Sequence, residues 1–354
     1  MNRTVETVEL RIYVRELLSS CMNRDSLNQL KREFSERIKF TIREGKAIFY
    51  GLKGSPLSLF GVIIVTFFVI VALMAPLLAP PEPDQNPYIC PYEGQNPYIY
   101  PLPSFPSSQH FFGTLDGYDI YYGCIWGART AFRMALLVIF VELVIGLSVG
   151  SVAGYFGGPA DELMMRLTDI FFAFPRILLA MIFIVALPAE WSLNLGSLSL
   201  STTFSPLDKL AIAIAIVGWP LYARLIRGEI IKVKSEDYVE AAKAVGCSSI
   251  RVMTRHILPN AIYPVLIMAF LDIGGITLSI TTLSFLGFGP QEGYAEWGTM
   301  ISNTRRFLFW STTEPFKYIH TFLFPGLFIS CFVLGWSLIG DVLRNVLDPM
   351  LRRR

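Results

Sequence analysis

Six runs of about 20 predominantly apolar residues determine what this chain can fold into. A helix of that length crosses the roughly 30 Å hydrocarbon core of a bilayer. A soluble fold would have to bury all six runs, yet only 16% of the 354 residues are charged and 53% are hydrophobic. We therefore predict an all-α integral membrane protein with six transmembrane helices. The predicted spans cover residues 57–79, 132–156, 163–187, 207–226, 261–288 and 318–339.

Lysine and arginine are distributed unevenly over the segments outside these spans. Residues 1–56 contain eleven of them, 224–255 contain seven and 344–354 contain four, whereas 80–128 contain none. Cytoplasmic segments of membrane proteins carry an excess of these residues. Both termini and the segment 224–259 are therefore predicted to be cytoplasmic. We expect the chain in the plasma or inner membrane of a cell.

The same patterns divide the chain into regions. A basic, amphipathic extension covers 1–56 and precedes the first transmembrane helix. A Pro/Tyr-rich loop outside the cytoplasm covers 80–130, because nine prolines between 80 and 106 oppose regular helix there. The other five helices form a core over 131–342, which contains a polar loop at 235–259. A basic cytoplasmic tail covers 343–354.

That polar loop lies between the fourth and fifth spans and has the form of a helix, a glycine and a second helix. Ser235 is placed to cap the first helix, whose first turn is acidic. Gly246 suits the left-handed position that follows a helix. Ser248 or Ser249 can begin the second helix. Its predicted apolar face consists of Ile250, Met253 and Ile257.

The composition of the loop favours a docking surface for a soluble partner. Its alanines leave a narrow helix that a partner's backbone can approach closely, and two charged residues can add polar contacts. The alternative is an ordinary helix–turn–helix connection, because Glu-Ala-Ala triplets are common in helices. The residues predicted to form the docking surface are Glu240, Ala241, Ala242, Lys243, Gly246, Arg251, Leu258 and Pro259.

Two carboxylates, Glu142 and Asp272, fall inside predicted spans. An ionised carboxylate at that depth costs several kcal/mol unless it is paired or wetted. Either residue could line a translocation path. The alternative is a protonated carboxyl that is hydrogen-bonded between helices.

Asp169 and Arg176, both in the third span, are placed for an imperfect pair with each other. In the same region, Asp161 is predicted as a helix cap, Glu162 and Arg166 as an i,i+4 pair, and glycines 146, 150 and 154 as a packing seam.

Other classes of protein lack support in the sequence. An intramembrane enzyme would need a reactive motif such as H-E-x-x-H or G-x-S-x-G, and neither occurs. A stand-alone channel or secondary transporter predicts inverted repeats, which the chain does not show. Five scattered cysteines and three histidines make a metal site unexpected. Cys90 and Cys124 both fall in the outer loop, where a disulfide between them is an open alternative.

Several motifs together resemble the permease subunits of the dipeptide/oligopeptide ABC importer family, over about residues 55–352. The loop resembles the family's coupling loop through Glu240-Ala-Ala, Gly246 and Leu258-Pro259. Two positions depart from the family pattern, with Tyr118 where arginine is usual and Asn345 where aspartate is usual. The remaining motifs are His110-Phe-Phe-Gly-Thr114 with Asp116, Gly127-Ala-Arg-Thr130, Asp161 to Arg166, Phe174-Pro175, Gly218 to Glu229, Leu283 to Gly289, Trp297-Gly298, Gly340-Asp341 and Leu347-Asp-Pro349.

This resemblance implies an ABC importer type I permease-like bundle, with both termini inside and half of a translocation path. The implied partners are a second homologous permease, two ATPase subunits and an extracytoplasmic substrate-binding protein, within the lipid bilayer and without nucleic acid. ATP and Mg²⁺ would be bound by the ATPases, because this chain has no G-x-x-x-x-G-K-[ST] loop. The implied cargo is a dipeptide or oligopeptide, with an oligosaccharide or a nickel chelate as alternatives.

Overall fold

The computed structural model describes residues 56–83, 85–92, 101–188, 190–195, 198–308 and 316–347. The chain divides into two units, and Leu57–Arg344 forms the unit that contains the helical bundle. The predicted N-terminal extension and the end of the C-terminal tail lie outside the described residues, so their predicted character stays a prediction. The Pro/Tyr-rich loop contains the sequence Gln-Asn-Pro-Tyr-Ile twice, at 85–89 and 95–99, and the second copy is also outside the described residues.

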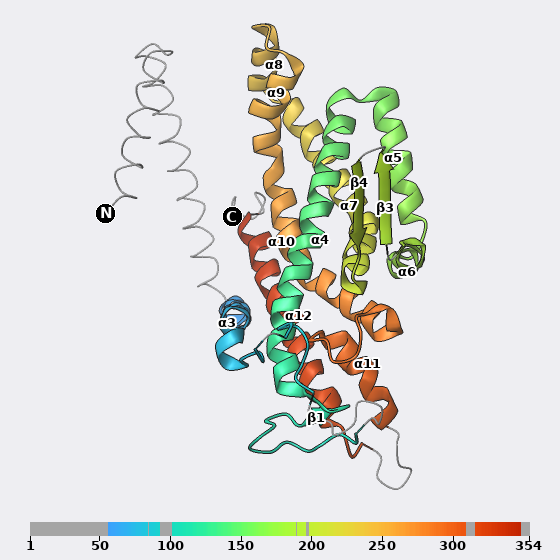
Figure 1. The fold of residues 1–354 in the computed structure, drawn as a ribbon. Helices are drawn as coiled ribbons and strands as arrows, with labels where there is room; N and C mark the ends of the chain where they lie inside the picture. Colours follow the sequence, from blue (N-terminus) through green and yellow to red (C-terminus); the bar gives the residue numbers. More distant parts are fainter. Residues whose placement is uncertain are drawn as a thin grey trace, which may run out of the picture. The chain divides into compact units, whose positions relative to one another are not determined.

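The bundle is predominantly helical (Figure 1). Within the described ranges, five helical segments are long and apolar enough to cross a membrane, or six if one bent pair of helices counts as a single span. The predicted all-α membrane-protein fold class is therefore confirmed, whereas the number of six spans and the cytoplasmic location of both termini stay predictions. The helices are α3 (Pro56–Leu78), α4 (Ile120–Phe156), α5 (Gly158–Phe172), α6 (Arg176–Ala186), α7 (Pro206–Lys234), α8 (Asp237–Ala244), α9 (Ser249–Val252), α10 (Leu258–Leu283), α11 (Trp297–Leu308) and α12 (His320–Leu347).

The third predicted span is wrong as a continuous helix. Helices α5 and α6 meet at an angle of 94°. The break falls at Phe174 and Pro175, because proline has no backbone N–H to donate and disfavours helical geometry at the residue before it. Hydropathy alone did not reveal the bend, since the residues on both sides of it are apolar.

The second span begins earlier than predicted, at Ile120 instead of residue 132. Asp119 caps it, because its side chain accepts a hydrogen bond of 2.8 Å from the backbone N–H of Tyr122. The predicted span included Arg133 but began after Arg129, whose charge interrupts the apolar run. Those arginines lie over aromatic rings, with Arg129 against Trp126 and Arg133 against Tyr88. Helix α4 can therefore include both charges.

The second helix of the polar loop is not a separate element. Helix α9 passes through a π-helical turn, η1 (Met253–Ile257), directly into α10, and a second π-helical turn, η2 (Ser284–Phe288), ends the segment. Together they form one stretch of 40 residues, Ser249–Phe288. Pro259 lies in the first turn of α10, where a helix does not need its missing N–H.

Two short antiparallel hairpins were not predicted in this all-α fold. Strands β1 (Thr114–Leu115) and β2 (Tyr118–Asp119) form one pair. Strands β3 (Glu190–Leu195) and β4 (Leu198–Thr203) form the other, with Glu190 opposite Thr203. Both hairpins occupy connections between helices. In β3 and β4, polar residues alternate with apolar ones, and this period of two is typical of a strand.

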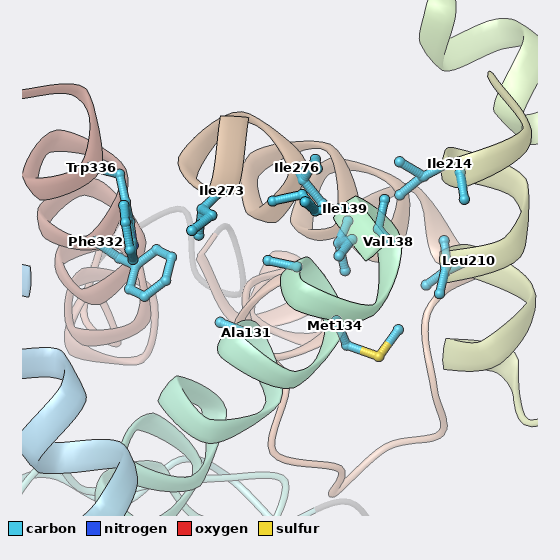
Figure 2. Packing of buried hydrophobic residues seen from close by; sticks show 14 of the residues in the cluster. Ala131, Met134, Val138, Ile139, Leu210, Ile214, Ile273, Ile276, Phe332 and Trp336 are labelled. Atoms are coloured by element: carbon cyan, nitrogen blue, oxygen red, sulfur yellow. The ribbon is translucent and has the colours of Figure 1, made fainter. Parts of the chain in front are cut away.

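The core of the bundle is built around α4. Figure 2 shows its side chains between those of α7 on one side and α12 on the other, with α10 alongside. The glycines of the predicted seam lie where α4 meets α7, and a Cβ at Gly146 would be 2.6 Å from the Cβ of Tyr222. The seam therefore packs within the bundle. The labelled core residues are Ala131, Met134, Val138, Ile139, Leu210, Ile214, Ile273, Ile276, Phe332 and Trp336.

Candidate functional site

Helices α8 and α9 lie at one end of the bundle, opposite the end that contains β1 and α11 (Figure 1). Helix α7 reaches this end because it continues to Lys234, eight residues beyond the predicted end at 226. Ser235 does not cap α8 as predicted. It ends α7, where its hydroxyl donates to the carbonyl of Lys232 at 2.8 Å, and Glu236 occupies the N-cap position of α8.

Gly246 ends α8 in the conformation that the sequence predicted. Its φ is +81°, which is in the left-handed region that glycine adopts without strain. Its N–H donates to the carbonyl of Lys243 at 2.9 Å, and the N–H of Cys247 donates to that of Ala242 at 3.1 Å. These two bonds form a Schellman motif, which fixes the direction of the chain between α8 and α9.

The helix pair has one buried side and one exposed side. Val239 and Ala242 are buried against the bundle, so Ala242 does not belong to the outer surface to which the sequence analysis assigned it. Glu240, Ala241 and Lys243 are exposed. After the role predicted from the sequence, we use the name docking surface for part of this exposed side, which consists of Tyr238, Glu240, Ala241, Lys243, Ala244, Val245, Ile250 and Arg251.

Large apolar side chains stand out on this docking surface. Val245 is 82% exposed and Ile250 is 78% exposed. Ile250 was predicted to share one apolar face with Met253 and Ile257. The structure separates them, because Ile257 is fully buried whereas Ile250 is exposed. Within α9 itself, the buried residue is Val252. The prediction of that face was therefore wrong, because it could not tell which side of the helix meets the bundle. Leu258 and Pro259 are partly buried at the start of α10.

A second polar group lies inside the bundle. The carboxylate of Glu142 on α4 is fully buried, and its Oε1 is 3.1 Å from Nη2 of Arg176 at the start of α6. Gly218 of α7 provides the room, because a Cβ there would overlap the carboxylate. Arg176 therefore pairs with Glu142, and not with Asp169 as predicted.

Asp272 belongs to the same polar group. Its Oδ2 accepts a hydrogen bond of 3.2 Å from the hydroxyl of Tyr222, one turn along α7 from Gly218. Gly218 in turn lies directly against Glu142 and Arg176. The two carboxylates singled out in the sequence are thus brought together in one polar layer by α4, α6, α7 and α10. Arg176, Gly218 and Tyr222 were not predicted from the sequence to belong to this layer.

Ion pairs join α5 to α7. Arg227 donates through Nε and Nη2 to both oxygens of Asp161, at 2.5 and 2.6 Å. Asp161 is therefore an ion-pair partner and not the helix cap that was predicted, since Gly157 occupies the N-cap position of α5. Arg224 pairs with Asp169.

The opposite end of the bundle contains a buried carboxylate. Asp116, in the turn between β1 and β2, has a 1% exposed side chain and lies 3.6 Å from Nη2 of Arg306 on α11. Burial raises the pKa of Asp116 to about 6, although the charge of Arg306 acts against this increase. Arg306 lies between the fifth and sixth predicted spans, in a segment expected outside the cytoplasm. Arginine is less common on that side of a membrane, and its presence was the available signal for this contact. Cys90 and Cys124 are both free thiols.

Within the described residues, no group of histidine, cysteine and acidic side chains could hold a metal ion.

Comparison with known proteins gives two family matches. Residues 146–353 match the family of binding-protein-dependent transport system inner membrane components, which is more than half of the chain. Residues 46–100 match the N-terminal TM domain of oligopeptide transport permease C. The two matches cover separate parts of the same chain, in the order in which the first span precedes the helical core.

Curated relatives extend over nearly the whole chain. The dipeptide transport system permease protein DppC of Alkalihalophilus pseudofirmus is 36% identical over 86% of this chain and 89% of its own length. The probable D,D-dipeptide transport system permease protein DdpC of Escherichia coli is 32% identical over 88% and 93%. The oligopeptide transport system permease protein OppC of Bacillus subtilis is 31% identical over 85% and 88%.

The apolar spans and the projecting helix pair, together with these matches, define a multi-pass permease of the inner membrane. More specifically, the chain belongs to the family of binding-protein-dependent transport system inner membrane components. A permease of this family is a transport protein and not an enzyme.

Proposed function

We infer that this chain is the permease subunit of an ATP-driven importer of peptides. The observation that carries the inference is the match over nearly the full chain to permeases whose names specify dipeptide, D,D-dipeptide and oligopeptide transport. The glutathione transport system permease protein GsiD of Pectobacterium atrosepticum is 34% identical over 75% of the chain, and glutathione is itself a tripeptide. These names favour a peptide as the cargo over the two alternatives named in the sequence analysis, an oligosaccharide and a nickel chelate.

The docking surface on α8 and α9 is the proposed contact with a cytoplasmic ATPase. A compact helix pair with exposed Val245 and Ile250 beside charged Glu240 and Lys243 has the mixed apolar and polar character of a protein interface. Gly246 supports the surface by fixing the angle between the helices. Leu258 and Pro259 connect it to α10.

The remaining partners follow from the division of work in an importer. The proposed complex contains a second homologous permease, two ATPase subunits that bind ATP and Mg²⁺, and a substrate-binding protein on the outer side. ATP hydrolysis belongs to the ATPases, because this sequence has no phosphate-binding loop. Both termini and the docking surface would face the cytoplasm, in agreement with the distribution of lysine and arginine.

The polar layer around Glu142 and Asp272 is the proposed lining of the translocation path. Charged groups inside membrane spans usually face a protein interior or a wetted passage. The side chain of Arg176 is 36% exposed while its partner Glu142 is fully buried, so the arginine is the charge that water or cargo can reach. Asp272 is partly exposed on α10.

An uptake assay in the native organism tests the peptide assignment. Deletion of the gene should abolish accumulation of a radiolabelled dipeptide or tripeptide, and re-expression of the wild-type chain should restore it. Labelled maltotriose and a nickel–histidine chelate serve as the matched alternative cargoes. Unchanged peptide uptake together with lost uptake of either alternative would overturn the peptide assignment while leaving the permease assignment in place.

A further inference from the structure

The bent α5–α6 pair is attached to α7 through polar contacts. Near the docking surface, Arg227 of α7 donates two parallel hydrogen bonds to Asp161 of α5. A paired contact of this kind is strong and also fixes the orientation of the two side chains. The two side chains are 33% and 18% exposed, so water screens this pair only in part. At the far end, the ammonium of Lys209 on α7 donates to the carbonyl of Leu187, just after α6, at 2.8 Å.

A second contact lies one helical turn along α7. Arg224 pairs with Asp169, its Nε donates to the hydroxyl of Thr168 at 3.1 Å, and its guanidinium lies 4.2 Å from the ring centroid of Phe172. Arg224 and Asp169 are more exposed than the first pair, at 42% and 58%. This second contact is therefore the weaker of the two, since water screens an exposed pair.

Apolar packing does little to hold α5 in place. Of its 15 residues, all of which are described, only Thr168 is buried. Leu163 is 73% exposed and Ile170 is 58% exposed. By contrast, α4 and α7 are packed through the glycine seam, where added side-chain atoms would collide. Helix α5 is thus a lightly packed element that is held to a tightly packed pair mainly by charge.

The Arg227–Asp161 ion pair lies close enough to the docking surface to receive movement from it. Helix α7 is continuous from Arg227 to Lys234, and α8 begins at Asp237. The distance along the helix from Arg227 to the end of α7 is only about 10 Å at 1.5 Å per residue. On the other side of the contact, α5 leads to the 94° bend at Pro175, and α6 begins with Arg176 of the polar layer.

We propose that Arg227 and Asp161 are positioning residues for transport: their ion pair makes α5, and with it the bend to Arg176, follow α7 when a docked ATPase displaces α8. The inference rests on the proposed function, because it needs a partner at the docking surface. Hinge movements of this kind are commonly absorbed by a few residues at the ends of elements, which is where Phe174 and Pro175 lie.

Charge exchange across the pair tests this role. The complete transporter, with its native permease and ATPase partners and binding protein, is reconstituted in proteoliposomes with Arg227→Asp, with Asp161→Arg, and with both changes together. Uptake of a radiolabelled dipeptide and ATP hydrolysis are measured on the same preparations. The control is Glu162→Arg with Arg166→Glu, which reverses an ion pair within α5 whose side chains are 72% and 74% exposed.

Each single change should leave ATPase recovery and ATP hydrolysis near the wild-type level, while peptide taken up per ATP falls about 5-fold or more, the lower end of typical coupling energies. The exchanged pair should recover most of that loss, and the control should lose nothing. The milder variants Asp161→Asn and Arg227→Gln replace any single variant that does not assemble.

Two results would overturn the proposal. One is an unchanged ratio of uptake to ATP hydrolysis in assembled single variants. The other is a loss that the exchanged pair does not recover, accompanied by an equal loss of thermal stability, which would show that the pair is only structural. Failure of the wild-type preparation to contain any ATPase is a different outcome, and it would overturn the proposed function itself.

Discussion

Glu142 and Arg176 form an ion pair between α4 and α6, with 3.1 Å between Oε1 and Nη2. The carboxylate is fully buried, whereas the arginine is partly exposed. Oε2 of Glu142 and Nε of Arg176 have no hydrogen-bond partner within the described residues. The hydrogen-bonding capacity of the pair is therefore only partly used, and the charge of each residue is balanced by that of the other.

Removal of one charge from this pair should be more harmful than removal of both. Arg176→Gln leaves the fully buried Glu142 without its counter-charge, and breaking a buried pair typically costs about 3–5 kcal/mol. The double variant Glu142→Gln with Arg176→Gln should recover at least half of the loss. Thermal unfolding of the purified chain in one detergent measures both. Equal stability of the single and double variants would show that the charges are not coupled.

Gly218→Ala should destabilise the protein, because the new methyl group would overlap the Glu142 carboxylate and lie 2.8 Å from Nη2 of Arg176. Forcing an extra methyl into a packed site typically costs about 1–3 kcal/mol. Gly228→Ala is the matched control on the same helix, since nothing lies within 4 Å of the added Cβ. That change should be neutral or slightly stabilising by thermal unfolding. Similar effects at the two glycines would contradict the close approach at Gly218.

Substitutions at Gly246 should differ in how much local stability they cost. Its φ of +81° favours glycine, then asparagine, over alanine and valine. Gly246→Ala should cost about 1 kcal/mol or more of local stability, and Gly246→Asn should cost less. Hydrogen exchange of the amides of Gly246 and Cys247, which donate the two closing bonds, reports the change directly. Faster exchange in the asparagine variant than in the alanine variant would contradict the assignment of this turn.

The stability contributed by Asp116 should depend on pH. Its pKa is raised from 3.8 to about 6 in the folded state, so the folded protein binds this proton more tightly than the unfolded chain does. That stability is present in full below pH 4 and is lost as the pH rises through about 6.

Asp116→Asn removes this titration but keeps the shape of the side chain, and Arg306 keeps Glu292 as a partner at 2.7 Å. The variant should match the wild type near pH 4 and exceed its stability by up to roughly 3 kcal/mol near pH 7, from 1.36 kcal/mol per pKa unit. Thermal unfolding at several pH values measures the difference. A difference that does not change between pH 4 and pH 7 would contradict the raised pKa.

Much of the fold could be predicted from the sequence because its strongest signals are local. Apolar length located the spans, and a glycine at the end of a short polar helix predicted the left-handed turn at Gly246. The bend at Pro175 was missed because hydropathy averages over a break whose flanks are both apolar. The early start of α4 was missed because Arg129 interrupts the apolar run, and only the folded structure shows the Trp126 ring beneath it.

The candidate sites were predicted less completely, because they depend on contacts between distant parts of the chain. Glu142 and Asp272 were identified as unusual charges, but their neighbours Arg176 and Tyr222 could be assigned only once four helices were placed together. In the docking surface, the composition of the helix did not show which side faces outward. Ala242 therefore entered the prediction although it is buried, and Val245 was omitted although it is exposed.

The central claim is that the surface on α8 and α9 binds an ATPase, and affinity purification of the tagged chain from its native membrane tests it most directly. Mass spectrometry of the eluate compares the wild type with Glu240→Arg, and with Glu190→Arg as a control at an exposed residue of β3. We predict that the wild type and the control recover a second permease and an ATPase, and that Glu240→Arg loses most of the ATPase while keeping the permease. Recovery of the wild-type chain without any ATPase, or equal recovery in all three samples, would contradict the account.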